Sequence, residues 1–381
     1  IYRVVRRQTV LLRSRLKRRW ILFKRRMLPL PGAAESTLRG WIKAHVWSPQ
    51  VEPLAGTAIQ RGIDLSPAVV HCHDLPTLPL GARIAEGAAA RLVYDSHELE
   101  MHRNAVYAPA VYRWRRWTEK RHIRRTDAVI TVSESIADHL RDDYGIPRPA
   151  VVLNAPDFDD AVTPVRDVRG DLALPAGTPI AVYVGSVTVN RGLDVMVRAL
   201  AHDPRLHFAT VGPRRPQTEV EMRAIAEELG VLDRLHFVDP LPPAEVVGYI
   251  RTATVSVLPI QNICLSYYYC MPNKLLESAF AGVPVAVADL IEMRRFVETY
   301  RCGEIMDETD PASVARTLTR IAADPAAYRM SPETRETVAA KFGWPRQAED
   351  LRRLYGELAP RGEQARTFSG DGAQEAAAAG A

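Results

Sequence analysis

Short apolar runs alternate with amphipathic segments along most of the chain. Runs of three to six apolar residues are typical of parallel strands covered on both faces, and apolar residues repeating every three or four positions are typical of helices. The alternation therefore predicts parallel pairing and a doubly wound α/β fold. Strands are expected at residues 68–72, 92–94, 127–132, 151–153, 180–184, 206–211, 235–238, 255–259, 284–288 and 303–306. Helices are expected at residues 77–90, 110–125, 134–144, 193–201, 219–229, 244–252, 311–323 and 348–358.

One further helix and its following strand, within residues 271–289, carry the clearest signals. Pro272 suits the first helical position, because its missing N–H would be unpaired there anyway. Gly282 is expected to end the helix, since glycine enters the left-handed conformation without steric cost. Lys274 and Glu277 lie three residues apart, so both can face one cleft beside the free amides of the first turn. A surface lysine and glutamate on a core helix is the plain alternative.

A second candidate phosphate site follows the strand at residues 180–184. Gly185 and Ser186 end the strand, and Arg191 precedes the next helix. A strand, a glycine turn, a basic residue and a helix start together favour phosphate binding. The stretch lacks the P-loop pattern GxxxxGK[ST] and the dinucleotide pattern GxGxxG, so ATP-dependent and NAD-dependent functions lose their main support. A solvated loop arginine is the alternative for Arg191.

Histidines gather where the first two predicted strands end. His71 and His73 stand in the sequence VHCHD, and His97 stands in VYDSHE. Ligands of doubly wound sheets bind outside the carboxyl ends of the strands, so these side chains are candidates for a site. A His-x-His pair with a third histidine can also hold zinc. Packed polar side chains at strand ends are the third interpretation.

The sequence P-N-K-x-x-E-x-x-x-x-G-x-P-V at residues 272–285 resembles the donor-site signature of retaining glycosyltransferases of family 4. Further similarity runs from about Val69 to Tyr355. The resemblance implies the GT-B fold, in which two Rossmann-like domains face a cleft. It implies that Glu277 binds the ribose of a nucleotide sugar. It also implies that the preceding turn, with Pro272, Asn273 and Lys274, holds the diphosphate on backbone amides.

The same resemblance extends to the other candidate residues. Gly185 and Arg191 match the family element Y-x-G…(K/R)-G, whose basic residue meets the donor's diphosphate. Ser186 stands where a second basic residue is often found. His97 matches a histidine near the transferred carbon of the sugar. The resemblance implies a donor substrate and no bound metal or other cofactor, so no metal site is expected.

Two departures from the family pattern limit what is carried over. Tyr269 stands where many members have a second glutamate, so contacts of that glutamate to the sugar are not transferred. The strand, glycine-rich loop and helix that usually open the first domain are not found before Val69. The expected fold is therefore GT-B with an N-terminal domain that lacks its first strands.

The implied function is retaining transfer of a sugar from a nucleotide-diphosphate sugar by front-face substitution. A glycan or a lipid-linked molecule of the cell envelope is the expected acceptor. Two alternatives stay open at this point. One is a nucleotide-sugar epimerase on the same fold, which would need an acid–base pair that the sequence does not single out. The other is a binding protein without catalysis.

The formal net charge of +5 comes from one end of the chain. Residues 1–34 contain eleven Arg and Lys and no Asp or Glu, and residues 1–30 have the pattern of a basic amphipathic helix with Trp20 and Phe23 on its apolar stripe. Such a helix suits an anionic membrane surface, and packing on its own domain is the alternative. No nucleic-acid motif accompanies the charge, so no nucleic-acid partner is expected.

Length and composition complete the expected organisation. The 381 residues are 47% hydrophobic and 25% charged, which suits two globular domains. Four cysteines without CxxC or metal spacing favour a reducing cytoplasm, with a possible peripheral position on the inner face of the membrane. The predicted parts are a basic helix (1–31), an N-terminal domain (32–157), a linker (158–178), a donor-binding domain (179–340), a helix returning to the first domain (341–359) and a disordered tail (360–381).

Overall fold

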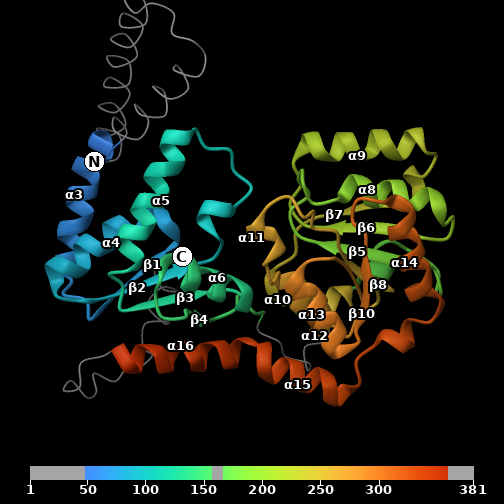
Figure 1. Cartoon of the computed structure of the whole chain (residues 1–381). Helices are drawn as coiled ribbons and strands as arrows, with labels where there is room; N and C mark the ends of the chain where they lie inside the picture. Colours follow the sequence, from blue (N-terminus) through green and yellow to red (C-terminus); the bar gives the residue numbers. More distant parts are fainter. Residues whose placement is uncertain (1–47, 157–165, 359–381) are drawn as a thin grey trace, which may run out of the picture. The chain divides into compact units, whose positions relative to one another are not determined.

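The computed structural model describes residues 48–156 and 166–358 (Figure 1). The predicted basic helix of residues 1–31, the first part of the predicted linker and the predicted tail lie outside the described residues. The described residues group into two compact units. One contains residues 48–58 with Val106–Thr118, and the other contains Ile59–Ala105 with residues 119–156 and 166–358. Both β-sheets belong to the second unit.

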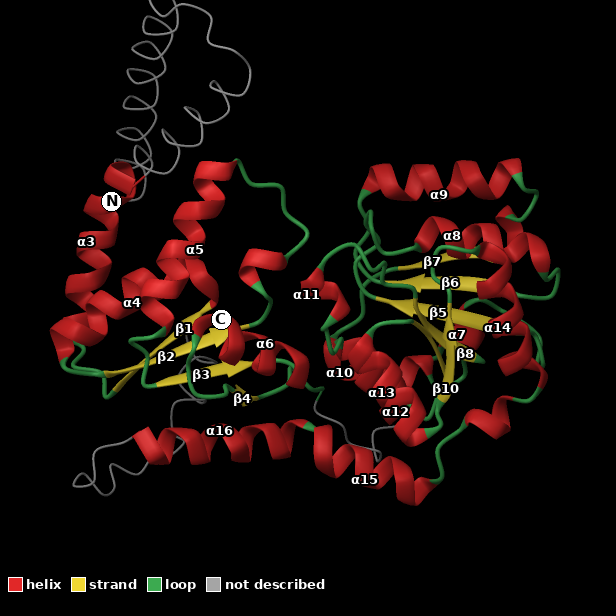
Figure 2. Cartoon of the chain, viewed as in Figure 1, coloured by secondary structure: helices red, strands yellow, loops and turns green. Residues whose placement is uncertain are grey.

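The N-terminal sheet has four strands in the order β1-β2-β3-β4, and every neighbouring pair is parallel (Figure 2). Its strands are β1 (Val69–His73), β2 (Arg91–Ser96), β3 (Ala128–Thr131) and β4 (Ala150–Val151). The described helices of this half are α3 (Ser48–Asp64), α4 (Asp74–Ala88), α5 (Pro109–Ile123) and α6 (Glu134–Tyr144), with a 3-10 turn at Glu100–His102. Within the described residues the first strand begins at Val69, one residue after the predicted start.

The C-terminal sheet has six parallel strands in the order β10-β9-β8-β5-β6-β7. Its strands are β5 (Ile180–Val184), β6 (His207–Val211), β7 (Leu235–Val238), β8 (Val255–Leu258), β9 (Val285–Ala288) and β10 (Gly303–Met306). Every residue of β5, β8 and β9 is buried, which explains their continuous apolar runs. The strand order reverses between β5 and β8, and such a switch point is where open α/β sheets bind ligands.

The helices of the C-terminal half follow the strands in turn. They are α7 (Val168–Asp171), α8 (Leu193–Ala199), α9 (Pro216–Glu228), α10 (Pro243–Ile250), α11 (Leu265–Tyr268), α12 (Asn273–Phe280), α13 (Ile291–Tyr300), α14 (Pro311–Ala323), α15 (Pro332–Phe342) and α16 (Trp344–Leu358). Short 3-10 turns lie at Leu200–His202, Leu232–Arg234 and Pro325–Tyr328. No helix among the described residues is long and apolar enough to cross a membrane.

The α/β fold of two parallel-sheet halves is confirmed, and α6, α14, β7 and β10 have the predicted bounds. Several helix starts were wrong, and α4 and α9 each begin three residues earlier than predicted, at Asp74 and Pro216. Pro272 is the residue before the first turn of α12, with φ −78° and ψ 140°, rather than its first helical residue. Helix α16 begins at Trp344, between the two predicted starts at residues 341 and 348. Gly282 has φ +68° two residues after the end of α12, where it ends the helix as predicted.

Helix α3 was not predicted, because two prolines and two glycines interrupt its apolar pattern. Two glycines allow close packing of α3 and α4. A Cβ at Gly62 would lie 2.7 Å from Ile84 Cδ1, and a Cβ at Gly87 would lie 2.4 Å from Ile63 Cδ1. Each helix thus presents a glycine to an isoleucine of the other, which apolar periodicity alone does not reveal.

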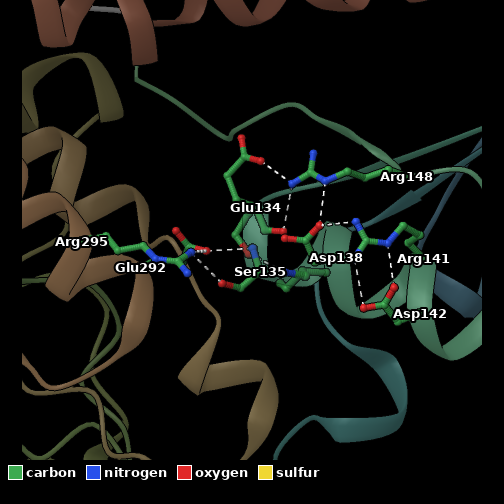
Figure 3. Close-up of polar contacts among 10 residues, drawn as sticks. Glu134, Ser135, Asp138, Arg141, Asp142, Arg148, Glu292 and Arg295 are labelled. Atoms are coloured by element: carbon green, nitrogen blue, oxygen red, sulfur yellow. Dashed lines mark hydrogen bonds and ion pairs between the residues drawn. The ribbon is translucent and has the colours of Figure 1, made fainter.

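A buried carboxylate on α13 caps helix α6 (Figure 3). The backbone N–H of Ser135, in the first turn of α6, donates to Glu292 Oε1 at 2.8 Å. Arg295 donates to the Ser135 hydroxyl at 3.3 Å and lies 3.4 Å from Glu292 Oε1. The bond satisfies one of the free amides at the start of α6 and places a negative charge at its N-terminus. On the surface of α6, Asp138 forms an ion pair at 2.8 Å with Arg148, which follows the helix.

Helix α16 also contacts the N-terminal sheet. The Leu153 N–H donates to Gln347 Oε1 at 2.8 Å, and Gln347 is 4% exposed. The Tyr355 hydroxyl lies 2.5 Å from His71 Nδ1. Both contacts join the last described helix to the N-terminal half. The predicted domain limits remain predictions, because these contacts do not fix a boundary.

Candidate functional site

All eight predicted site residues line one cavity of about 390 Å³. Its wall includes the carboxyl end of β5, the start of α12 and the residue that follows β2. The predicted residues in this wall are His97, Gly185, Ser186, Arg191, Pro272, Asn273, Lys274 and Glu277. Tyr183, Tyr267, Glu98 and Asn154 also line it. The sequence therefore identified a set of residues that the fold brings together, although their roles remain predictions.

Lys274 lies in the first turn of α12, directly beside the carboxyl end of β5. Its Nζ donates to the Tyr183 hydroxyl at 3.1 Å and lies 4.2 Å from the centre of the Tyr183 ring. A Cβ at Gly185 would come within 3.3 Å of the same Nζ, and Gly185 has φ +130°, which favours glycine. The glycine after β5 thus leaves room for a cation at the switch point of the sheet.

Arg191 supplies a second positive charge on the cavity wall. Its guanidinium lies 5.2 Å from the centre of the Tyr267 ring on α11. Cation–π contacts of this kind hold an arginine in place while leaving its N–H donors available. The next residue, Gly192, has φ +67°, and a Cβ there would meet the Pro259 carbonyl at 2.3 Å. The loop that carries Arg191 therefore packs tightly against the end of β8.

Glu277 lies one turn after the start of α12 and is partly buried. Burial raises the pKa of the Glu277 carboxyl above its ordinary value, and the positive charge of Lys274 offsets only part of that effect. A carboxylate that is partly stripped of water lacks hydrogen-bond donors, so it is ready to accept bonds from ligand hydroxyls. This environment suits the predicted contact with a ribose.

His97 follows β2 and reaches the cavity from the N-terminal sheet. Its backbone N–H donates to Asp74 Oδ1 at 3.1 Å, and its Nε2 lies 3.0 Å from Asp95 Oδ2. Burial would raise the pKa of Asp95, but hydrogen bonds from His71 and His97 and the charges of both outweigh burial and lower it. Asp95 is therefore an ionised residue that orients the imidazole of His97.

The sequence did not reveal three of the supporting residues. In the sequence, Tyr183 is one of five consecutive apolar residues of a buried strand. Only the structure shows that its hydroxyl accepts a hydrogen bond from Lys274. Asp95 lies in the sequence VYDSHE, but its position in the sequence does not show that its carboxylate contacts three histidines. Tyr355 lies 284 residues from its partner His71. Pairs at that separation leave no signal in a single sequence.

Two family profiles match the chain. Glycosyltransferase Family 4 matches residues 12–159, and Glycosyl transferases group 1 matches residues 178–324. Relatives called D-inositol 3-phosphate glycosyltransferase are similar over most of the chain. The one from Xylanimonas cellulosilytica is 27% identical over 308 residues, covering 77% of this chain and 72% of its own. The one from Corynebacterium jeikeium is 28% identical over 314 residues, covering 78% of this chain and 74% of its own.

Solved structures give the same result for the fold. Sucrose-phosphate synthase from Thermosynechococcus elongatus superimposes with a TM-score of 0.64 at 25% identity, covering 76% of this chain and 73% of its own. Anabaena HepE, solved in complex with UDP and glucose, superimposes with a TM-score of 0.65 at 15% identity, covering 82% and 83%. The similarity to HepE therefore shows only that the two proteins share a fold.

Proposed function

Because the chain belongs to the family 4 glycosyltransferases and has the GT-B fold, we propose that it transfers a sugar from a nucleotide-diphosphate sugar with retention of anomeric configuration. The observation that carries the proposal is the single cavity that collects Arg191, Lys274, Glu277 and His97. These side chains supply two cations, one partly buried carboxylate and one imidazole. This combination suits the binding of a donor that consists of a diphosphate, a ribose and a sugar.

The two cations act on the leaving group. When the bond to the sugar breaks, negative charge develops on the diphosphate. Arg191, Lys274 and the free amides at the start of α12, after Pro272 and Asn273, are placed to stabilise that charge. The backbone of Gly185 and Ser186 approaches the same group from the end of β5. Because these groups balance the charge, the proposed mechanism includes no catalytic metal and no cofactor besides the donor.

Glu277 and His97 position the donor. The Glu277 carboxylate accepts hydrogen bonds from the ribose hydroxyls, and His97 orients the transferred sugar or the acceptor. No side chain of the cavity is assigned as a covalent nucleophile. A front-face substitution, in which the acceptor attacks on the side that the diphosphate leaves, therefore accounts for retention. The HepE structures with UDP and with UDP-glucose support a nucleotide-sugar donor on this fold.

The acceptor side of the proposal depends on the sequence of the first thirty residues. We propose a glycan or lipid-linked acceptor of the cell envelope, reached from the cytoplasm while residues 1–30 bind an anionic membrane surface. Eleven basic residues without an acidic one before Glu35 support membrane binding. Each basic residue near an anionic surface contributes about 1 kcal/mol, which suffices for reversible attachment.

The first test measures donor binding and stereochemistry. UDP and UDP-glucose are the first probes, followed by other nucleoside diphosphates, with affinity measured by isothermal titration calorimetry. Arg191→Ala and Lys274→Ala should weaken binding. The matched controls Arg223→Ala and Lys120→Ala, at exposed positions on α9 and α5, should not. Proton NMR of the transfer product reports the anomeric configuration. An inverted product, or no binding of any nucleoside diphosphate, would overturn the proposal.

A further inference from the structure

Three histidines surround one carboxylate at the carboxyl edge of the N-terminal sheet. Oδ2 of Asp95 lies 3.2 Å from His71 Nε2, 3.1 Å from His73 Nδ1 and 3.0 Å from His97 Nε2. His73 Nδ1 and His97 Nε2 are themselves 3.3 Å apart. We call these four residues the histidine cluster. It is built by β1 and β2, whose paired register places His73 beside Asp95.

Hydrogen bonding alone does not account well for this arrangement. A carboxylate oxygen offers lone pairs for about two well-aligned bonds, yet three ring nitrogens crowd Asp95 Oδ2. The close approach of His73 Nδ1 and His97 Nε2 also requires that at least one of them carries no proton. Several lone pairs therefore converge on one point, and a cation placed at that point would satisfy them together.

The separations fit the ligands of a tetrahedral metal. Zinc–nitrogen and zinc–oxygen bonds of about 2.0–2.1 Å put neighbouring ligand atoms about 3.3–3.4 Å apart. The three separations among His73 Nδ1, His97 Nε2 and Asp95 Oδ2 are 3.3, 3.1 and 3.0 Å, so a small outward shift brings them to that value. The ligand atoms of His71, His73 and Asp95 lie within 4.8 Å of one another, a group that does not include His97. His71 and His97 therefore need a larger shift than the other pairs to share one ion.

We propose that the histidine cluster binds a divalent transition-metal ion of the Zn²⁺ type through His71, His73, Asp95 and His97. Imidazole nitrogens with one carboxylate oxygen suit zinc and its neighbours in the first transition series. This binding does not depend on the proposed glycosyl transfer.

Surrounding groups support the ligand set. The Tyr355 hydroxyl lies 2.5 Å from His71 Nδ1, so it can accept that N–H and leave Nε2 free for the metal. Histidines that bind metals usually donate their other nitrogen in this way. The His73 side chain is 62% exposed and the Asp95 side chain 13% exposed. The metal therefore has a route from solvent to a partly buried carboxylate.

Metal binding should inhibit transfer, and this consequence rests on the proposed function. His97 belongs both to the histidine cluster and to the donor cavity. A metal that takes its Nε2 withdraws that nitrogen from the sugar or acceptor. The ion thus acts as a regulator of the site rather than as part of the reaction.

The test is a titration of the untagged full-length protein with Zn²⁺, followed by calorimetry, in the absence of donor. We expect one saturable site, weakened at least tenfold by His73→Gln and by Asp95→Asn. Tyr355→Phe should weaken it by about 10-fold or more, as loss of a supporting hydrogen bond does. His236→Gln is the matched control, since His236 lies 2.9 Å from His207 in a separate pair on the C-terminal sheet.

The absorption spectrum of bound Co²⁺ gives a second readout, because tetrahedral coordination by the cluster should produce visible bands that His73→Gln removes. His73 is largely exposed, so its substitution should leave the fold intact, which circular dichroism checks. Absence of saturable Zn²⁺ binding would overturn the proposal. So would equal weakening by His73→Gln and His236→Gln. Transfer assays with and without Zn²⁺ then test inhibition separately, so failure of the transferase proposal would not affect the binding result.

Discussion

Substitution Glu277→Gln should stabilise the free protein at neutral pH and weaken donor binding. Burial raises the pKa of the Glu277 carboxyl above its ordinary value of 4.5. The folded state therefore binds the proton more tightly than the unfolded state does. The stability that this proton contributes is lost as the pH rises through the folded pKa. As the pH rises above 4.5, the unfolded state gives up this proton more readily than the folded state, so deprotonation costs the folded protein stability. The neutral amide of glutamine removes that cost.

The binding effect follows from the proposed contact with ribose. A hydrogen bond to a charged group contributes about 1.5–3 kcal/mol, so its loss should raise Kd about 10- to 150-fold. Urea unfolding across the pH range measures the first effect, and calorimetry with UDP measures the second. Wild type and variant should be similar in stability below pH 4.5 and should diverge as the pH rises.

The exposed substitution Glu228→Gln at the end of α9 is the control, and it should change neither quantity. An unchanged Kd in Glu277→Gln would refute the ribose contact. A variant that is less stable than wild type at pH 7 would refute the argument from burial. The two outcomes are independent, so each part of the reasoning can fail alone.

Three further predictions concern other parts of the chain. Arg191→Ala and Lys274→Ala should weaken UDP binding by less together than the sum of their separate effects, because both cations contact one diphosphate; additive losses in calorimetry would indicate separate roles. Glu292→Ala should lower the free energy of unfolding by about 1–3 kcal/mol, since the Ser135 N–H loses its buried acceptor. Glu292→Gln should cost less, and equal losses in urea denaturation would contradict the capping role. The full chain should sediment with anionic vesicles at low salt more than a chain beginning at Gly32, and equal sedimentation would count against membrane binding.

The buried parallel strands were the most predictable part of the fold. The run IAVYV of β5 and the run VAVA of β9 are apolar throughout because both faces are covered. Helix α13 was missed, although Met293, Phe296 and Val297 repeat at helical spacing and are buried. Charged residues including Glu292, Arg294 and Arg295 occupy much of its ten-residue length, and Glu292 is buried by a contact with a distant helix.

The candidate site shows a similar division. Lys274 and Glu277 could be placed on one cleft because helical spacing fixes their relation. Arg191 could be added because a glycine turn precedes it. The partners that hold these side chains could not be predicted, since Tyr183 and Tyr267 meet their cations only after strand and loop have packed. Local geometry is encoded in nearby residues, whereas side-chain environment depends on distant ones.

The capping of α6 by Glu292 affects how chimeric transferases should be built. A design that joins this N-terminal half to the C-terminal half of a relative would separate Ser135 from Glu292, Leu153 from Gln347 and His71 from Tyr355. The Ser135 N–H, the Leu153 N–H and His71 Nδ1 would then lose these hydrogen-bond partners. A design with its crossover at the linker should therefore graft Glu292 and α16 into the new partner.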